Sequence, residues 1–292
     1  MENNYAILIA DIKSSRVYNE EDRFAIQERL KKIVDLLNYI FSRSLLLPLD
    51  FSAGDSIQGI FKNPEASLRC YFVLQNLFFP VIIRGGIGCD KIYESFTNSG
   101  DFKDTNEIDG SAYHLAREAI EIAKAKKYDV AFFSRDNSLD VYLNNMLMLS
   151  SNLKNCFSRS QRDLFRLCSF LSPILSEDEL LKYENRFSDM LPFFEFSPSI
   201  LNKYMYQEKL YSELLNILNI NKTNIEFYYD CYMMDHMFTA DLVSRSSDGY
   251  LAKFYNVTPQ NISSLRRRGK MNTIKTLDIL SSIYLWKEFN HD

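Results

Sequence analysis

Strand-like and helix-like patterns alternate over roughly the first 134 residues. Residues 5–10 form a short apolar run that ends at Asp11, a pattern typical of a central strand with a polar residue at its exit. Asn19 offers a cap for a long amphipathic helix that extends to Phe41. Alternating polarity on both sides of Gly54-Asp55 then predicts two antiparallel strands joined by a tight turn.

The pattern continues with a helix over 64–78, a strand over 81–88 with close-packed glycines, a helix over 111–127 with Ile122 among its inward residues, and a strand over 129–133. The order is βαββαβ followed by αβ. It predicts an α+β domain of the ferredoxin-like, or palm, type, with helices on one face of a mostly antiparallel sheet and the other face exposed. The segment 90–109 is predicted as a polar loop.

Strand-like runs vanish after residue 139, and apolar residues recur at helical spacing. We therefore predict two domains, a palm domain over 1–135 and a mostly α-helical domain over 136–292. The length of 292 residues, with 46% apolar and 25% charged residues, suits two folded domains. No run of eighteen apolar residues and no signal-peptide pattern occurs, so we expect a cytoplasmic protein that does not enter a membrane. Five cysteines without a CxxC pair are interpreted as packing residues.

Two carboxylates at adjacent strand ends repel each other unless a cation lies between them. Asp11 and Asp55 are therefore candidate ligands of Mg²⁺ or Mn²⁺, which prefer a few carboxylate oxygens together with phosphate and water. A nucleoside triphosphate is the expected third partner. The loop between the first strand and the first helix can turn N–H groups toward phosphate, and its candidate residues are Ile12, Lys13, Ser14, Ser15 and Arg16. The alternative that both acids only stabilise turns stays open.

Four segments taken together, 9–12, 52–55, 84–88 and 110–116, resemble the class III nucleotidyl cyclases in order and strand context. The resemblance covers roughly residues 5–134. It implies that Asp11 and Asp55 ligate two metal ions, and it places Phe51 and Gly54 in the nucleotide site.

The chain departs from the cyclase pattern at positions that decide the chemistry. Phe51 stands where many cyclases have a base-reading lysine, and Glu118 stands where they have an arginine that stabilises the transition state. No catalytic residue is therefore assigned. Arg84, His114 and Arg117 are candidates, each with the alternative of an ordinary surface or packing role.

The chain is also similar to the SatD family of bacterial proteins, on Asp11-Ile12-Lys13-Ser14-Ser15 and on the turn over 51–59. This resemblance spans most of the chain and implies an architecture that ends in helix-turn-helix sequence.

Residues 248–269 have the features of a helix-turn-helix. Thr258 is the predicted cap and Pro259 the first residue of the second helix. Residues 245–275 carry seven basic residues and one acidic residue. Polar side chains that can bond base edges precede arginines that can neutralise phosphate, which predicts DNA binding through Gln260, Asn261, Ser263, Ser264, Arg266, Arg267 and Arg268. A helical hairpin with a solvated basic face remains the alternative.

These observations lead to one main hypothesis and two alternatives. The main hypothesis is a SatD-like regulator whose palm domain binds a Mg²⁺-nucleotide and whose helix-turn-helix binds DNA, with a homodimer expected because such DNA-binding units commonly act in pairs. Dimer contacts are expected from apolar helices such as the one over 201–218, unless these form ordinary core. The alternatives are an active nucleotidyl cyclase or related phosphoryl-transfer enzyme, and an inert dimerisation module.

Overall fold

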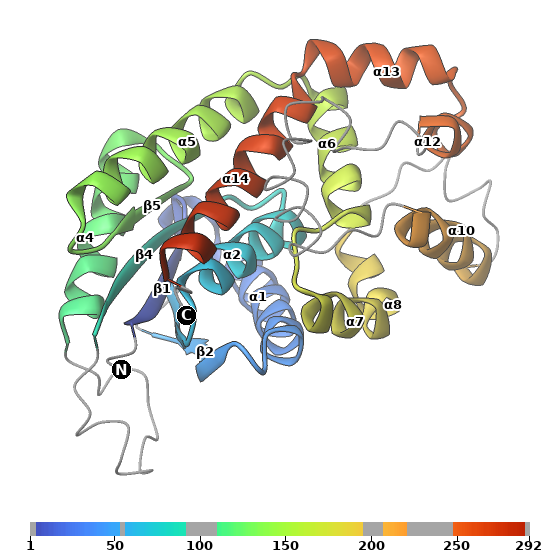
Figure 1. The fold of residues 1–292 in the computed structure, drawn as a ribbon. Helices are drawn as coiled ribbons and strands as arrows, with labels where there is room; N and C mark the ends of the chain where they lie inside the picture. The colour runs from blue at the N-terminus through green and yellow to red at the C-terminus, as the bar shows by residue number, and fades with distance from the viewer. Residues whose placement is uncertain (1–3, 53–55, 92–109, 195–206, 221–247, 290–292) are drawn as a thin grey trace. The chain divides into compact units, whose positions relative to one another are not determined.

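The computed structural model describes residues 4–52, 56–91, 110–194, 207–220 and 248–289 (Figure 1). The contacts between Cα atoms divide the chain into two compact units. One contains residues 1–151 and 280–292, and the other contains residues 152–279. The domain boundary near residue 135 stays a prediction.

The first unit contains a five-stranded sheet, and the prediction of a mixed α+β N-terminal part followed by a helical part is confirmed. The strand order is β2-β3-β1-β4-β5, with antiparallel pairs except for β5, which is parallel to β4. β4 extends through Asp90 and Lys91, so the prediction that the polar loop begins at residue 90 is wrong by two residues. The strands are β1 (Asn4–Ile12), β2 (Leu45–Phe51), β3 (Ser56–Phe61), β4 (Ile83–Lys91) and β5 (Val130–Phe133).

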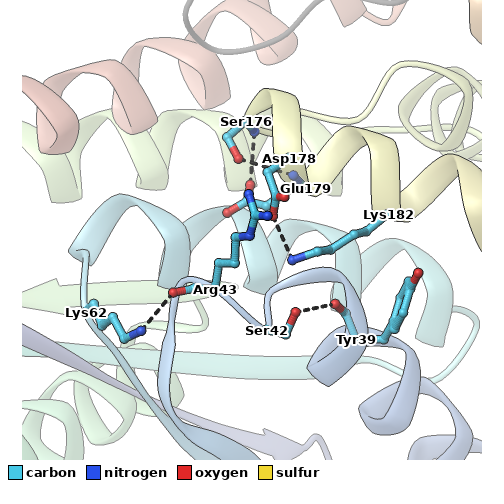
Figure 2. A network of polar contacts seen from close by, with 8 residues as sticks. All are labelled: Tyr39, Ser42, Arg43, Lys62, Ser176, Asp178, Glu179 and Lys182. Atoms are coloured by element: carbon cyan, nitrogen blue, oxygen red, sulfur yellow. Dashed lines mark hydrogen bonds and ion pairs between the residues drawn. The ribbon is translucent and has the colours of Figure 1, made fainter.

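Helices α1 (Glu20–Ile40) and α2 (Pro64–Phe78) cover one face of this sheet (Figure 1). On this face Tyr71 of α2 lies so close to Gly85 that an added Cβ would be 2.7 Å from its ring. The predicted cap of α1 is confirmed, because the side chain of Asn19 accepts a hydrogen bond of 2.7 Å from the N–H of Asp22. At the other end of α1, Ser42 donates to the carbonyl oxygen of Tyr39, as Figure 2 shows.

Helix α4 (Ser111–Lys126) covers part of the opposite face, so the prediction that this face is exposed is wrong. Ala112, Ala116 and Ile120 pack against Ile7 and Ile9 of β1. The helix comes this close because its inward residues are mostly alanines and β4 offers glycines beneath them. The close-packed glycines predicted in this strand are confirmed, whereas Ile122, predicted to face inward, is exposed.

Asparagine side chains close both edges of the sheet. Asn38 of α1 bonds both the N–H and the carbonyl oxygen of Leu49 in β2, at 2.8 and 2.9 Å. Asn144 of α5 (Asn137–Asn155) does the same for Phe132 in β5, at 2.9 and 2.6 Å. Unpaired edge groups can template association with another chain, and these contacts satisfy one residue of each edge strand.

In the described residues, the second unit is helical and is held together by an aromatic cluster. The rings of Phe170 and Phe187 stack at 4.7 Å, with Tyr183 and Phe194 beside them. Ser176 forms a capping box with Glu179, and Lys182 pairs with Asp178 at 2.7 Å (Figure 2). The helices of the second unit are α6 (Arg159–Leu171), α7 (Glu177–Asn185), α8 (Phe187–Met190), α10 (Gln207–Ile220), α12 (Asp248–Tyr255), α13 (Pro259–Arg268) and the part of α14 (Met271–Phe289) up to Ile279, with a 3-10 turn, η3 (Leu191–Phe193).

Helix α10 lies in the segment for which dimer contacts were predicted. Its apolar residues Leu210, Leu214, Ile217 and Leu218 are buried within the chain, which is the alternative of ordinary core. Residues 201–206 of that segment lie outside the described part. None of the helices that the structure describes is long and apolar enough to cross a membrane.

Candidate functional site

Asp11 lies at the end of β1 on the face that α4 covers. Side chains alternate along a strand, so Asp11 shares this face with Ile7 and Ile9. Its carboxylate is partly exposed, and Oδ2 lies 2.9 Å from Nζ of Lys124 on α4. The same lysine pairs with Glu121 at 3.1 Å.

The Lys124 ammonium is electrostatically tied to this carboxylate. Partial burial lowers the pKa of Lys124, but hydrogen bonds to Asp11 and Glu121 outweigh that effect and leave the pKa above its usual value. Lys124 therefore remains charged over the physiological pH range.

Arg84 of β4 is the direct cross-strand partner of Asp11. Directly opposed residues of an antiparallel pair point to the same face, with Cβ atoms about 5 Å apart. Arg84 is half-buried, and among the described residues its guanidinium has no hydrogen-bond or ion-pair partner. Arg84 therefore adds a second cation beside the Asp11–Lys124 pair, and the described residues offer it no partner.

The second predicted metal ligand, Asp55, and its neighbour Gly54 lie outside the described residues. Ser56 follows Asp55 in the sequence and is the partner of Asp11 on β3. Its carbonyl oxygen accepts a hydrogen bond of 2.8 Å from the N–H of Ser52. Phe51 is half-buried at the end of β2.

The predicted phosphate loop leaves β1 in an unusual conformation. Ser14 has a left-handed backbone with φ of 58°, and the 3-10 turn η1 (Ser15–Val17) follows it. A left-handed residue next to a right-handed one turns successive N–H groups into a concave surface that suits an anion. Lys13 is exposed, while Ile12, Ser15 and Arg16 line a pocket of about 260 Å³ together with Tyr18, Arg23, Ile26 and Gln27.

His114 and Arg117 do not approach Asp11. Both lie on the exposed side of α4, near the part of the helix that covers Ile7. Ile7 and Asp11 are four residues apart, which corresponds to about 13 Å along a strand. Arg117 instead donates to the hydroxyl of Tyr113 at 2.7 Å. Of the three catalytic candidates, the structure brings only Arg84 to Asp11.

A second candidate site lies on α13. Thr258 caps this helix by accepting a hydrogen bond of 3.3 Å from the N–H of Asn261, as predicted. Most of the predicted base-reading and phosphate-binding side chains are exposed, with Ser264 half-buried: Gln260, Asn261, Ser263, Ser264, Arg267 and Arg268.

Arg266 differs from its neighbours because it is buried. It pairs with Asp248 at 2.9 Å and donates to the Cys168 sulfur at 3.4 Å, so it joins α13 to α12 and α6. This environment makes Arg266 a packing residue, so of the three arginines predicted to contact phosphate only Arg267 and Arg268 are exposed.

Comparison with protein families gives a match over about the first two thirds of the chain. The family model described as the SatD family matches residues 5–190, well over half of the sequence. The chain belongs to the SatD family. The matched residues include Asp11, Arg84 and Lys124, whereas α12 and α13 lie beyond them.

Other comparisons add little to the SatD assignment. No curated protein matches the chain. A solved structure described as a bacterial light-regulated adenylyl cyclase is similar, with 13% identity and a TM-score of 0.32, over 44% of this chain and 75% of that one.

Sequence reasoning about this SatD chain missed Lys124. The helical spacing held a signal, because Lys124 follows Ala116 and Ile120 at intervals of four residues and therefore lies on the same stripe of α4. Only the packing of that stripe on β1 shows that the lysine ends beside Asp11.

Proposed function

We propose that this SatD chain binds a Mg²⁺-bound nucleoside triphosphate at the end of β1. The observation that carries the proposal is the convergence of Asp11, Arg84 and Lys124 on one face of the sheet, next to the residue that follows Asp55. The order β2-β3-β1-β4 is also the order that a ferredoxin-like βαββαβ core requires, which supports a palm-type domain.

The residues at this site fit a metal that is held jointly with phosphate. No group of three or more carboxylate, thiol or imidazole side chains that could hold a metal alone occurs among the described residues. Mg²⁺ usually takes one or two carboxylates together with substrate phosphates and water. Asp11 and Asp55 would supply the carboxylates, and Arg84 and the N–H groups of residues 14–16 would bond phosphate oxygens, whereas the N–H of Lys13 already donates to the carbonyl oxygen of Ile82 at 2.8 Å.

The direct test is calorimetric titration of the protein with each Mg²⁺-nucleoside triphosphate. Asp11→Asn and Asp55→Asn should each weaken binding at least tenfold. Asp35→Asn removes an exposed carboxylate from α1 and serves as the matched control. Absence of binding by the unaltered protein, for every triphosphate, would contradict the proposal.

Phosphoryl transfer by a cyclase-type reaction is the second candidate function. Metal-bound triphosphate and a ribose hydroxyl would be its reactants, and pyrophosphate its second product. Phe51 and the exposed Glu118 disfavour it, because the base-reading lysine and the transition-state arginine are absent from those positions. Pyrophosphate release that is lost in Asp55→Asn would establish the enzyme instead of a binding module. A module that only dimerises would show no thermal stabilisation by Mg²⁺-nucleotide.

For the helical unit we propose a helix-turn-helix that binds DNA through α13. The supporting observation is an exposed helix start with Gln260 and Asn261, followed by the exposed Arg267 and Arg268. Of the seven basic residues counted between 245 and 275, the structure exposes Lys253, Arg267, Arg268 and Lys270.

A salt titration of binding to duplex DNA tests this proposal. Arg267→Ala should weaken binding and lower the slope of log affinity against log salt by about one, because one phosphate contact is lost. Arg159→Ala, an exposed residue on α6 with the same charge, is the control. Equal slopes for both variants would show that Arg267 makes no phosphate contact, and the absence of binding by the unaltered protein would leave only a solvated basic face.

We further propose that nucleotide occupancy adjusts the affinity for DNA. A ligand shifts a conformational equilibrium only by its differential affinity for the two states. DNA affinity should therefore change when Mg²⁺-nucleotide is added, and the change should disappear in Asp11→Asn. An identical DNA affinity with and without every nucleotide would reject the coupling.

A further inference from the structure

Packing between α4 and the sheet determines where Lys124 lies. An added Cβ on Gly88 would be 2.2 Å from the backbone nitrogen of Ala116, and one on Gly86 would be 2.4 Å from that of Ile120. Two strand residues span about 6.6 Å and four helix residues about 6 Å, so α4 and β4 stay in step. The next step along both elements brings Lys124 to the level of Arg84 and Asp11.

Along this register the contact between α4 and β1 is apolar at first and ionic at the end of the strand. Ile7 and Ile9 meet the apolar stripe of α4, and Asp11, two residues further on β1, meets Lys124. The lysine reaches the carboxylate from a helix whose backbone lies against the glycines of β4. The core packing therefore fixes the position of Lys124, whereas the position of an ordinary surface ion-pair partner is not fixed in this way.

The ammonium of Lys124 lies at hydrogen-bond distance from Asp11 Oδ2, where a divalent ion bound to that oxygen would also lie. Two cations at one carboxylate repel each other, so a metal ion alone has to compete with the ammonium for Asp11. The lysine then keeps Glu121 as a partner, and phosphate oxygens brought by the metal offer it a second one.

We propose that Lys124 is an internal counter-ion of Asp11 that makes the binding of metal and of polyphosphate cooperative. This inference rests on the proposed nucleotide function. Lys124 disfavours a bare divalent ion by occupying Asp11, and it favours a metal–polyphosphate complex because its ammonium moves from the carboxylate to a phosphate oxygen. The site therefore selects the complex over either of its components.

The cooperativity is a measurable coupling between two ligands. If polyphosphate raises the affinity for the metal by some factor, the metal raises the affinity for polyphosphate by the same factor. Manganese binding followed by electron paramagnetic resonance, with and without a non-hydrolysable nucleoside triphosphate analogue, gives the factor without any turnover.

Three proteins distinguish the possible outcomes. Lys124→Met should bind Mn²⁺ alone at least threefold more tightly than the unaltered protein, bind the Mn²⁺-triphosphate complex more weakly, and show a coupling factor reduced at least tenfold. Lys124→Arg should retain most of the coupling because it keeps the charge. Lys126→Met, at an exposed position in the same last turn of α4, should behave as the unaltered protein.

Two results would overturn the inference, and they separate it from the proposed function. If the unaltered protein binds the Mn²⁺-triphosphate complex and Lys124→Met has the same two affinities and the same coupling factor, Lys124 is a surface ion pair and only the inference fails. If the unaltered protein binds neither Mn²⁺ nor the complex while remaining folded by circular dichroism, the proposed function fails together with the inference.

Discussion

Gly88 fixes the distance between α4 and the sheet. An added Cβ at this position would lie 2.1 and 2.2 Å from backbone atoms of Ala112 and Ala116, which cannot rotate away. We predict that Gly88→Ala lowers the free energy of unfolding by about 3 kcal/mol, in the upper range for overpacked cores. Urea unfolding followed by circular dichroism measures the loss. Gly249→Ala is the control, since no atom of the described residues lies within 4 Å of the added Cβ, chain neighbours aside, and alanine favours the exposed start of α12. A loss as large there would contradict this explanation.

Lys275 should make stability depend on pH. Burial lowers the pKa of Lys275 to about 8 from its ordinary 10.5, partly offset by Asp278. Between these pH values the unfolded chain binds a proton that the folded chain does not, so the free energy of unfolding rises with pH by up to roughly 3 kcal/mol. The rise is most visible from pH 8 to 10. Burial raises the pKa of Tyr183 and of Tyr255 in the folded chain, so above about pH 10 these tyrosines ionise only after unfolding and the free energy of unfolding falls again.

Urea unfolding of the unaltered protein and of Lys275→Met at several pH values provides the measurement. The variant should lose the rise between pH 8 and 10. Lys275→Met also removes the lysine that donates to the carbonyl oxygen of Ser172, which lowers stability at every pH. The two proteins are therefore compared by the slope of the free energy of unfolding against pH. Equal slopes for the two proteins would exclude Lys275 as the titrating group.

At the level of elements, the two asparagines that close the sheet edges should contribute more to stability than is usual for partly exposed polar side chains. Asn38→Ala and Asn144→Ala each leave one N–H and one carbonyl oxygen of an edge strand without a partner. We predict a loss of about 1–3 kcal/mol each and faster aggregation on heating. Thermal unfolding with simultaneous light scattering measures both. The control is Asn145→Ala. Its exposed amide donates to the carbonyl oxygen of Val141 in the same helix and, among the described residues, to no edge strand, so an equal effect there would contradict edge closure.

Elements with local signals were predictable from the sequence. Asn19 and Thr258 cap α1 and α13 as expected, because a cap depends on residues within one turn of the chain. The sheet face covered by α4 was not predictable in this way. Its inward stripe consists mostly of alanines, which carry little hydrophobic signal, and the larger Ile122 was assigned inward together with Ala119 and Ala123.

The same distinction between local and long-range signals applies to the candidate site. Asp11 was identified because it ends an apolar strand, a feature of the neighbouring residues alone. Lys124 and the burial of Arg266 depend on contacts between elements far apart in sequence, Asp11 in one case and Asp248 and Cys168 in the other. Charge and spacing alone do not separate a buried arginine from its two exposed neighbours.

At the level of the whole molecule, the chain does not divide simply into a first and a second half. The end of the chain, residues 280–292, belongs to the same compact unit as residues 1–151. In this last segment Ile283 and Leu285 are buried, and the pKa of Tyr284 is raised by burial, by Glu288 and by Asp136 of the residues before α5. The stability of the unit that contains Asp11 should therefore depend on the last helix.

A chain that ends at Ile279 tests this dependence. Loss of Ile283 and Leu285 removes apolar burial of about 1.5–3 kcal/mol for each side chain, so the truncated chain should be less stable by several kcal/mol and should bind Mg²⁺-nucleotide more weakly. Leu285→Ala should reproduce about 2–5 kcal/mol of the loss without shortening the chain, whereas Lys287→Ala, at an exposed position, should leave stability unchanged. Urea unfolding and calorimetric titration provide the two measurements. Unchanged stability and affinity in the truncated chain would show that residues 1–151 form this unit without the end of the chain.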